Sequence, residues 1–307
     1  MAALSRWWFA PVALGRVAAL RVLAYLFIPV DVLLTTSWVG DQAGARELYQ
    51  PLVLAEWLRL PVPTPSMVVV LRAALLTAAA MAAVAALVGG TRAVRTAGAA
   101  TAVLYLWWMF VAMSYGKVDH DRFAFLVLLA VLPTVGAARP GERTRSAAAG
   151  WAVRTTQVAV VATYFLAAWA KVRIGGWGWV NGGTLAWALV RRNTPLSGWM
   201  VQVPGLLRLL QWATLLFELA SPLLLAVRSE RTRTWLVAMV YGFHLATFAM
   251  LGIIFLPHLV ALAAFLPLER IGRRAYVDGS AGTFDVHRSS RVPAGPAPWT
   301  RDREAKP

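Results

Sequence analysis

The chain has 307 residues, of which 59% are hydrophobic and 14% are charged, and its 30 Lys and Arg against 14 Asp and Glu give a formal net charge of +16. This composition excludes an ordinary soluble domain. The absence of cysteine excludes disulfides, thiolate catalysis and cysteine-based metal sites. Because the basic residues flank apolar blocks, we expect them to contact anionic membrane lipid, and we expect no nucleic-acid partner.

The apolar residues come in blocks near the roughly 20 residues that an α-helix needs to span a bilayer. A β-barrel would instead show short strands of alternating polarity. We therefore predict an all-α fold, a polytopic membrane helix bundle of about eight transmembrane helices. Their predicted ranges are Val17–Trp38, Met67–Val88, Ala99–Ser114, Phe123–Ala138, Trp151–Val172, Leu206–Val227, Trp235–Leu251 and Ile253–Leu268.

The last two predicted spans leave almost no connection between them. They could instead form one long helix with a kink at Pro257, which would give seven spans. We assign residues 1–274 to the transmembrane domain. Residues 275–307 contain Pro and Arg and few bulky apolar side chains, so we expect this segment to be a disordered cytoplasmic tail.

The distribution of Lys and Arg predicts the orientation of the helices in the membrane. With eight spans, all five clusters of arginine fall on one side, which places both termini in the cytoplasm. These clusters lie within residues 6–21, 92–95, 139–145, 228–233 and 270–274. Arg191 and Arg192 run against this trend, but they lie in a long connection, where the rule is weaker. We expect an integral protein of a bacterial-type plasma membrane.

Ionisable side chains inside membrane helices are costly unless they are paired or hydrated, so each one is a candidate functional residue. In chain order they are Asp31, Arg72, Lys171, Glu218 and His244, with His120 and His258 at the starts of the fourth and eighth spans. Under the predicted topology, His120, Lys171 and His258 lie near the extracytoplasmic ends of their helices. Glu218 and His244 lie deeper, and a cleft open to that face could gather all five.

Most of these residues also have a purely structural interpretation. His120 lies in a polar turn, "SYGKVDHDRF", and could simply face water. Asp31 and Arg72 could form a structural pair between neighbouring helices, and Glu218 could be protonated and bonded to a backbone carbonyl. The two histidines of the last spans are too far apart in sequence for an i, i+4 metal pair, so we expect no metal site.

Lys171 lies near the end of an apolar helix, in "TYFLAAWAKVRIGGWGW". It could extend to the membrane interface beside Trp177 and Trp179 without taking part in chemistry. However, Tyr164, Ala167, Ala168 and Lys171 share one helix face. The small side chains between the tyrosine and the lysine would let another helix or a flat ligand come close. In an apolar pocket, such a lysine can lose its proton and act as a base.

The segment "YFLAAWAKV" resembles the Tyr-Phe-x-Ala-Gly-x-x-Lys pattern of the HTTM family, the horizontally transferred transmembrane domain, which forms the membrane part of vitamin K-dependent gamma-carboxylase. The resemblance covers about residues 20–269 and implies that Lys171 is the base that deprotonates a quinol, vitamin K hydroquinone in that enzyme. "WGWVNGG" is similar to the Trp-x-x-Gly segment that follows, which places Trp179 in the pocket. Ala170 stands where the carboxylase has a second lysine.

Two further segments extend the resemblance. "VDHDRFAFLVLLAVLP" resembles the carboxylase segment whose histidine supports the lysine, and His120 is the matching position. "MVYGFHLATF" resembles its Tyr-x-His helix, which places His244 in the site region. The resemblance thus implies catalytic roles for Lys171 and His120. Together with the cleft expected from the topology, which brings in Glu218, it predicts a substrate or cofactor pocket that includes Tyr164, Trp179, His244 and Glu218.

Two classes of function follow. The first is an enzyme that binds a quinol between its helices and uses the lysine as a base, either in a gamma-carboxylase-like reaction on a peptide or protein or in a simpler quinone-linked oxidation. The second is a non-enzymatic membrane factor for the maturation or handling of a peptide, as in HTTM proteins of the sporulation-delaying protein B type.

The orientation can be tested with cysteines introduced into this cysteine-free chain. If both termini are cytoplasmic, cysteines at Ser5 and Ser280 should be protected from an impermeant thiol reagent in intact cells, whereas a cysteine at Gly183 should react. Labelling at Ser280 but not at Ser5 would indicate an odd number of spans.

Overall fold

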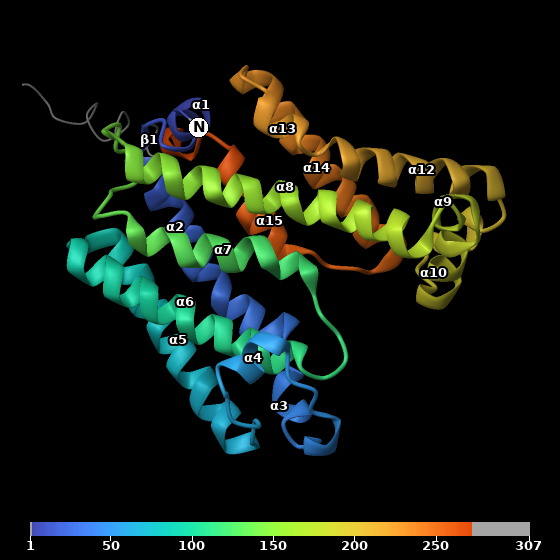
Figure 1. Ribbon diagram of the computed structural model, residues 1–307, viewed down its shortest axis with the longest axis horizontal. Coiled ribbons are helices and arrows are strands. Elements are labelled where there is room, and N and C mark those ends of the chain that lie inside the picture. Colours follow the sequence, from blue (N-terminus) through green and yellow to red (C-terminus); the bar gives the residue numbers. More distant parts are fainter. Residues whose placement is uncertain (1, 272–307) are drawn as a thin grey trace, which may run out of the picture.

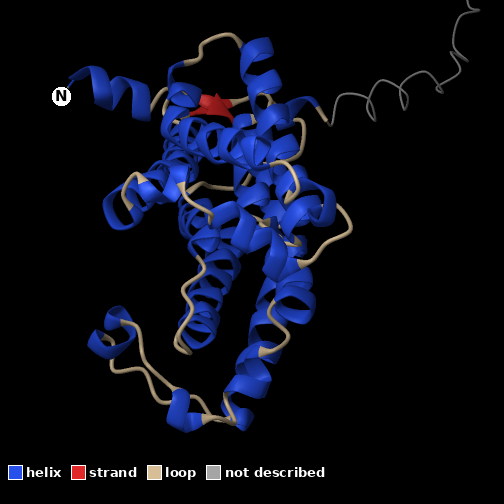
Figure 2. Ribbon diagram, turned by 90° about the vertical axis from the view of Figure 1, so that its right-hand side faces the viewer, coloured by secondary structure: helices blue, strands red, loops and turns tan. Residues whose placement is uncertain are grey.

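The computed structural model describes residues 2–271 as an almost entirely helical bundle (Figures 1 and 2). The predicted tail, residues 275–307, lies outside the described residues. The helices are α1 Ala2–Trp8, α2 Leu14–Val30, α3 Val39–Gln42, α4 Val53–Trp57, α5 Pro65–Val88, α6 Thr91–Met113, α7 Phe123–Val131, α8 Ala147–Gly175, α9 Gly178–Asn181, α10 Thr184–Arg192, α11 Ser197–Met200, α12 Pro204–Ala220, α13 Leu223–Ala226, α14 Glu230–Leu251 and α15 Leu256–Leu262.

One short antiparallel strand pair joins β1 (Val12–Ala13) to β2 (Arg145–Ser146), near the N-terminal end of the bundle (Figure 2). It brings the starts of α2 and α8 together. The guanidinium of Arg145 adds to this contact by donating two hydrogen bonds to the carbonyl of Pro11, at 2.8 and 3.1 Å. The strand pair therefore links two long helices at one end, and it does not alter the all-α class.

Five helical segments of the described chain are long and apolar enough to cross a membrane: Leu14–Thr35, Pro65–Val88, Thr91–Met113, Ala147–Gly175 and Glu230–Leu251. The other three predicted spans are also helical but shorter. Helices α7, α12 and α15 have 9, 17 and 7 residues. At 1.5 Å per residue, nine residues rise only about 14 Å, which is less than the hydrocarbon thickness of a bilayer. The predicted number of eight full spans is therefore not confirmed.

The last two helices are separate, and the break lies before the predicted one at Pro257. Helix α14 ends at Leu251, and Gly252 takes a left-handed conformation with φ of +64° while its N–H bonds to the carbonyl of Phe248. Glycine adopts this conformation without steric cost. The chain then starts α15 at Leu256, with Pro257 in the first turn, where a proline needs no hydrogen-bond donor.

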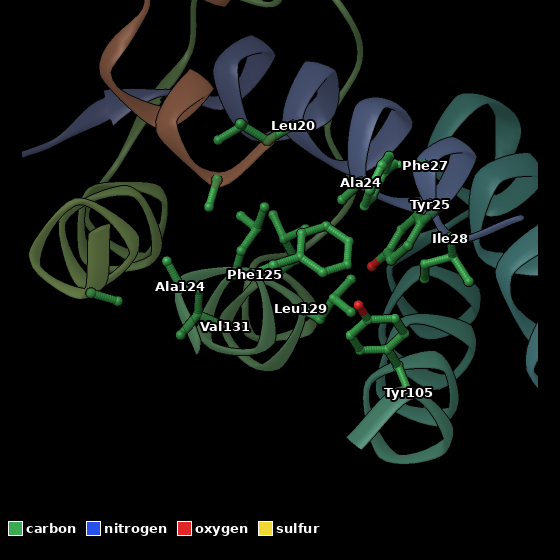
Figure 3. Close-up of a cluster of buried hydrophobic side chains, with 14 of the residues drawn as sticks. Leu20, Ala24, Tyr25, Phe27, Ile28, Tyr105, Ala124, Phe125, Leu129 and Val131 are labelled. Atoms are coloured by element: carbon green, nitrogen blue, oxygen red, sulfur yellow. The ribbon is translucent and has the colours of Figure 1, made fainter. Parts of the chain in front are cut away.

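The centre of the bundle is formed by α2, α6 and α7 (Figure 3). The ring of Phe125 packs edge-on against Phe27 and Tyr105, with centroid distances of 5.3 and 5.2 Å. Helix α5 contributes a face of small side chains, including Ala79 and Ala82, which lets it approach its neighbours closely. This packing explains why the short helix α7 is stable: it lies among longer helices.

A buried network of polar side chains ties these helices together. Asp31 is fully buried and accepts hydrogen bonds from Arg122 at 2.6 and 2.7 Å and from the hydroxyl of Tyr105 at 2.8 Å. The expected pair of Asp31 and Arg72 is wrong. Arg72 instead donates to the backbone carbonyl of Ser37 at 3.1 Å, and Asp31, the first residue of the π-helical turn that follows α2, pairs with Arg122.

Replacing Asp31 by Asn should destabilise the protein strongly, because it leaves the guanidinium of Arg122 buried without a counter-ion. We expect a loss of about 3 kcal/mol in the free energy of unfolding, measured by reversible unfolding in detergent micelles. The control is Asp119→Asn, because Asp119 pairs with Lys117, whose side chain is 79% exposed, and such a pair contributes at most about 1 kcal/mol. Equal losses for the two variants would contradict this interpretation.

Candidate functional site

A cavity of about 710 Å³ opens between α8, α12, α14 and the start of α15. Its walls are mostly aliphatic and aromatic, and they include Phe217, Phe243 and Phe255. All six residues predicted for the site line this cavity, namely His120, Tyr164, Lys171, Trp179, Glu218 and His244. The long helix α8 places Tyr164 and Lys171 two turns apart, and both line the cavity. Of the predicted face, Tyr164, Ala167 and Lys171 line the cavity, whereas Ala168 is buried with Val180 and Leu215.

The most polar feature of the wall is an ion pair between α8 and α12. Lys171 Nζ lies 2.7 Å from each carboxylate oxygen of Glu218. The side chains are 22% and 9% exposed, so the pair is shielded from bulk water. Glu218 thus bonds to a lysine and not to a backbone carbonyl, contrary to the structural interpretation given above. The two opposite charges satisfy each other, which makes both tolerable inside an apolar bundle.

Lys171 also lies over the ring of Trp179, with 5.2 Å between Nζ and the ring centroid. Trp177 takes no part in this contact. Its ring stacks on Trp212 at 6.0 Å, and its side chain is 62% exposed. The lysine is therefore held inside the cavity by a carboxylate and an aromatic face, and it does not extend outward beside both tryptophans as an interfacial anchor would.

His120 begins a short 3₁₀ turn, His120–Arg122, directly before α7. Its side chain is exposed toward the cavity and forms no side-chain hydrogen bond within the described chain. The surrounding chain partly desolvates His120, which lowers its pKa, and the positive charge of Lys171 lowers this pKa further. The imidazole is therefore neutral at neutral pH and can offer an acceptor nitrogen to a bound molecule.

Asp121, the next residue, also lines the cavity, and sequence reasoning missed it. Its side chain is buried, and burial raises its pKa to about 6. The only sequence signal was its place in "DHDRF", which was interpreted as a water-facing turn. The turn is polar, but it folds inward because the adjacent Arg122 is bound to Asp31.

Tyr164 and His244 form a second polar group in the cavity wall. Tyr164 lies on α8, seven residues before Lys171, and His244 lies on α14. The hydroxyl of Tyr164 lies 2.5 Å from His244 Nε2. His258, which was noted in the sequence but not assigned to the site, packs edge-on against the ring of Tyr164 at 4.6 Å and is 1% exposed. Within residues 2–271, no group of three or more His, Cys, Asp and Glu side chains is placed to hold a metal ion.

Gln211 of α12 holds the segment from Trp179 to Leu185, part of which lines the cavity, and sequence reasoning missed it too. Its amide nitrogen donates to the carbonyls of Trp179 and Val180 at 2.8 and 2.9 Å, and its oxygen accepts from the N–H of Leu185 at 2.9 Å. These bonds fix α9 and the start of α10 against α12. They therefore position Trp179 over the lysine.

Comparison with known proteins gives one match. The family model described as "HTTM domain" matches residues 15–269, which is most of the chain. The searches found no matching curated protein and no matching solved structure. The match includes every helix that lines the cavity.

The ion pair can be tested by a double-mutant cycle. Lys171→Met and Glu218→Leu should each destabilise the protein, because each leaves a shielded charge without its partner, while the double variant should recover part of that loss. We expect a coupling energy of about 1–3 kcal/mol, from unfolding in detergent micelles. The same cycle on the exposed pair of Glu230 and Arg270 should give less than about 1 kcal/mol. Additive effects for the first pair would show that the contact is not maintained in the membrane protein.

Proposed function

This chain belongs to the HTTM family, and we propose that its cavity binds a flat molecule with an acidic hydroxyl, such as a quinol, and removes the hydroxyl proton at the Lys171–Glu218 pair. The observation that carries this proposal is the shielded ion pair in the wall of an otherwise apolar cavity. A pair used only for stability would not need to face an open volume. Catalytic sites often place charged groups in such surroundings.

The size and lining of the cavity support this class of ligand. Small-molecule sites commonly have volumes of about 300–1,000 Å³ and mostly apolar walls with a few polar groups. The cavity falls in this range. Phe217 stacks on Phe243 with 4.6 Å between ring centroids, and His244 lies 4.9 Å from the ring of Phe255. These rings provide flat surfaces suited to an aromatic ligand.

The proton transfer follows from the contacts of the lysine. While Lys171 donates to Glu218, it carries its proton and cannot accept another. The lysine must therefore pass that proton to the Glu218 carboxylate, over the 2.7 Å contact, and then take the proton of the hydroxyl. The ligand O–H bond breaks and an N–H bond forms, while an N–H bond breaks and the carboxyl O–H bond forms. The total charge of the cavity and its ligand does not change.

The other candidate residues would bind and orient the ligand. The neutral imidazole of His120 can accept or donate a hydrogen bond at the same hydroxyl, which makes it an orienting group. Trp179 covers the lysine and limits the access of water. A second substrate, a peptide or protein as in a gamma-carboxylase-like reaction, would have to approach from the extracytoplasmic side.

The role of Lys171 as a base is tested by substitution. Lys171→Ala should reduce quinol-dependent oxygen uptake by isolated membranes by about 100-fold or more, which is the usual contribution of a general base. Lys171→Arg should fail as well, because a guanidinium stays protonated at any usable pH. His120→Ala should cost less than either. Lys117→Ala is the matched control, since Lys117 is exposed and lies outside the cavity lining, and it should keep full activity.

The same variants separate the two classes of function. Full rescue by Lys171→Arg of the phenotype that a gene deletion produces would contradict the proposal, since arginine can replace a charge but not a base. That outcome would favour the non-enzymatic, peptide-handling role.

A further inference from the structure

A second cavity of about 430 Å³ lies between α12, α13 and α14. Its walls are aliphatic apart from Tyr164, Phe217 and Ser221. The hydroxyl of Ser221 already donates to the carbonyl of Val161 at 3.3 Å. The hydroxyl of Tyr164 is bonded to His244. The lining therefore suits a hydrocarbon chain better than a polar ligand, which would be left without partners.

This second cavity is open to the outside of the bundle. Leu223 of α13 and Met239 of α14 line it, and these side chains are 63% and 64% exposed. Helix α14 is one of the helices long and apolar enough to cross a membrane, so the opening faces lipid. An acyl chain of a neighbouring lipid can therefore enter from the side.

Two partly buried arginines lie at one end of the second cavity. Arg233 of α14 comes one helical turn before Leu236, which lines the cavity. Arg154 of α8 lies close enough to Arg233 and Arg16 to feel their positive charges. Arg16 is paired with Glu269 at 2.7 Å. Within the described chain, however, neither Arg154 nor Arg233 forms an ion pair.

The two guanidinium groups retain donors that the described chain does not use. The guanidinium of Arg154 lies over the ring of Trp7, 4.7 Å from its centroid, and its buried Nε has no hydrogen-bond partner in residues 2–271. Arg233 donates through Nε to the carbonyl of Phe265 at 3.2 Å. Each guanidinium has five N–H donors in a planar fork that matches the oxygens of a phosphate. An anion with several acceptor oxygens would therefore satisfy both arginines and offset their mutual repulsion.

We propose that Arg154 and Arg233 bind the phosphate of one anionic phospholipid, and that the second cavity holds part of one of its acyl chains. Basic pockets between membrane helices bind anionic headgroups in this way. Neither Lys171 nor Glu218 lines the second cavity, so the inference does not depend on the function proposed above. Phe217 lines both cavities, and the bound chain therefore supports the wall of the larger one.

The test counts lipids bound to the purified, delipidated full chain by native mass spectrometry. Dioleoyl phosphatidylglycerol is the anionic probe, and dioleoyl phosphatidylcholine is the zwitterionic one. The wild type should bind the first phosphatidylglycerol about 10-fold more tightly than the first phosphatidylcholine, and Arg154→Gln/Arg233→Gln should remove this preference. Ala220→Phe, which fills the second cavity without changing the charge, should weaken both lipids by about 10-fold, because several buried methylene groups of the acyl chain are displaced.

The matched control is Arg92→Gln/Arg143→Gln, which removes the same charge from two exposed arginines. This control should keep the preference of the wild type within about twofold. An equal loss in the control would show a general attraction to anionic lipid and would overturn the site. Unchanged lipid binding in Ala220→Phe would overturn the placement of the acyl chain, and Ala226→Phe gives the same comparison if Ala220→Phe does not fold.

Thermal unfolding separates a loss of binding from a loss of fold. Phosphatidylglycerol should raise the unfolding temperature of the wild type and of the control, but not that of Arg154→Gln/Arg233→Gln. If this double variant does not fold, Arg154→Gln alone provides the comparison, because its buried Nε has no partner in the described chain to lose. An equal rise with inorganic phosphate would show that the arginines bind a phosphate without a lipid, and it would overturn the proposal.

Discussion

A charge inside an apolar bundle must have a partner, and the structure follows from how this chain meets that requirement. The desolvation of a single ion costs far more than the few kcal/mol by which a protein is stable. Asp31 is bound to Arg122, and Lys171 is bound to Glu218, so each carboxylate lies next to a cation from a different part of the chain. The two contacts link elements that are 91 and 47 residues apart in sequence. Each pair therefore fixes helix positions that apolar packing alone would leave free to slide.

The Asp31–Arg122 pair is connected to the cavity of the Lys171–Glu218 pair through three consecutive residues, His120 to Arg122. Arg122 is anchored to Asp31, and it ends the same short turn that begins with His120. Because the turn is only three residues long, anchoring one end sets the position of the other. The structural pair at the end of α2 thus determines where the imidazole enters the cavity, next to Lys171. The stability of one half of the bundle and the geometry of the site in the other half depend on the same contact.

The parts of this arrangement that depend on local sequence could be predicted, and those that depend on long-range pairing could not. Blocks of apolar residues indicated the long helices α2, α5, α6, α8 and α14. Ionisable residues inside the apolar segments that form α8 and α12 identified Lys171 and Glu218 as candidates, because the cost of burying a charge can be recognised from the local sequence. The predicted partner of Asp31, Arg72, was wrong, because the true partner, Arg122, is 91 residues away in sequence and meets Asp31 only when the helices pack together. The sequence did not indicate a role for Gln211, because the sequence around a helical glutamine is the same whether its amide faces lipid or hydrogen-bonds to a distant backbone segment.

The unequal lengths of the helices have a consequence for the membrane around the protein. Helices α7 and α15 are short, but α7 packs among longer helices and most of α15 is buried, so their lengths need not match the lipid. Helix α5, with 24 residues, and α14, with 22, carry large exposed apolar faces and rise about 36 and 33 Å. Exposed helices such as these therefore sense the thickness of the bilayer. A thinner membrane would tilt α5 and α14 and leave the inner helices in place.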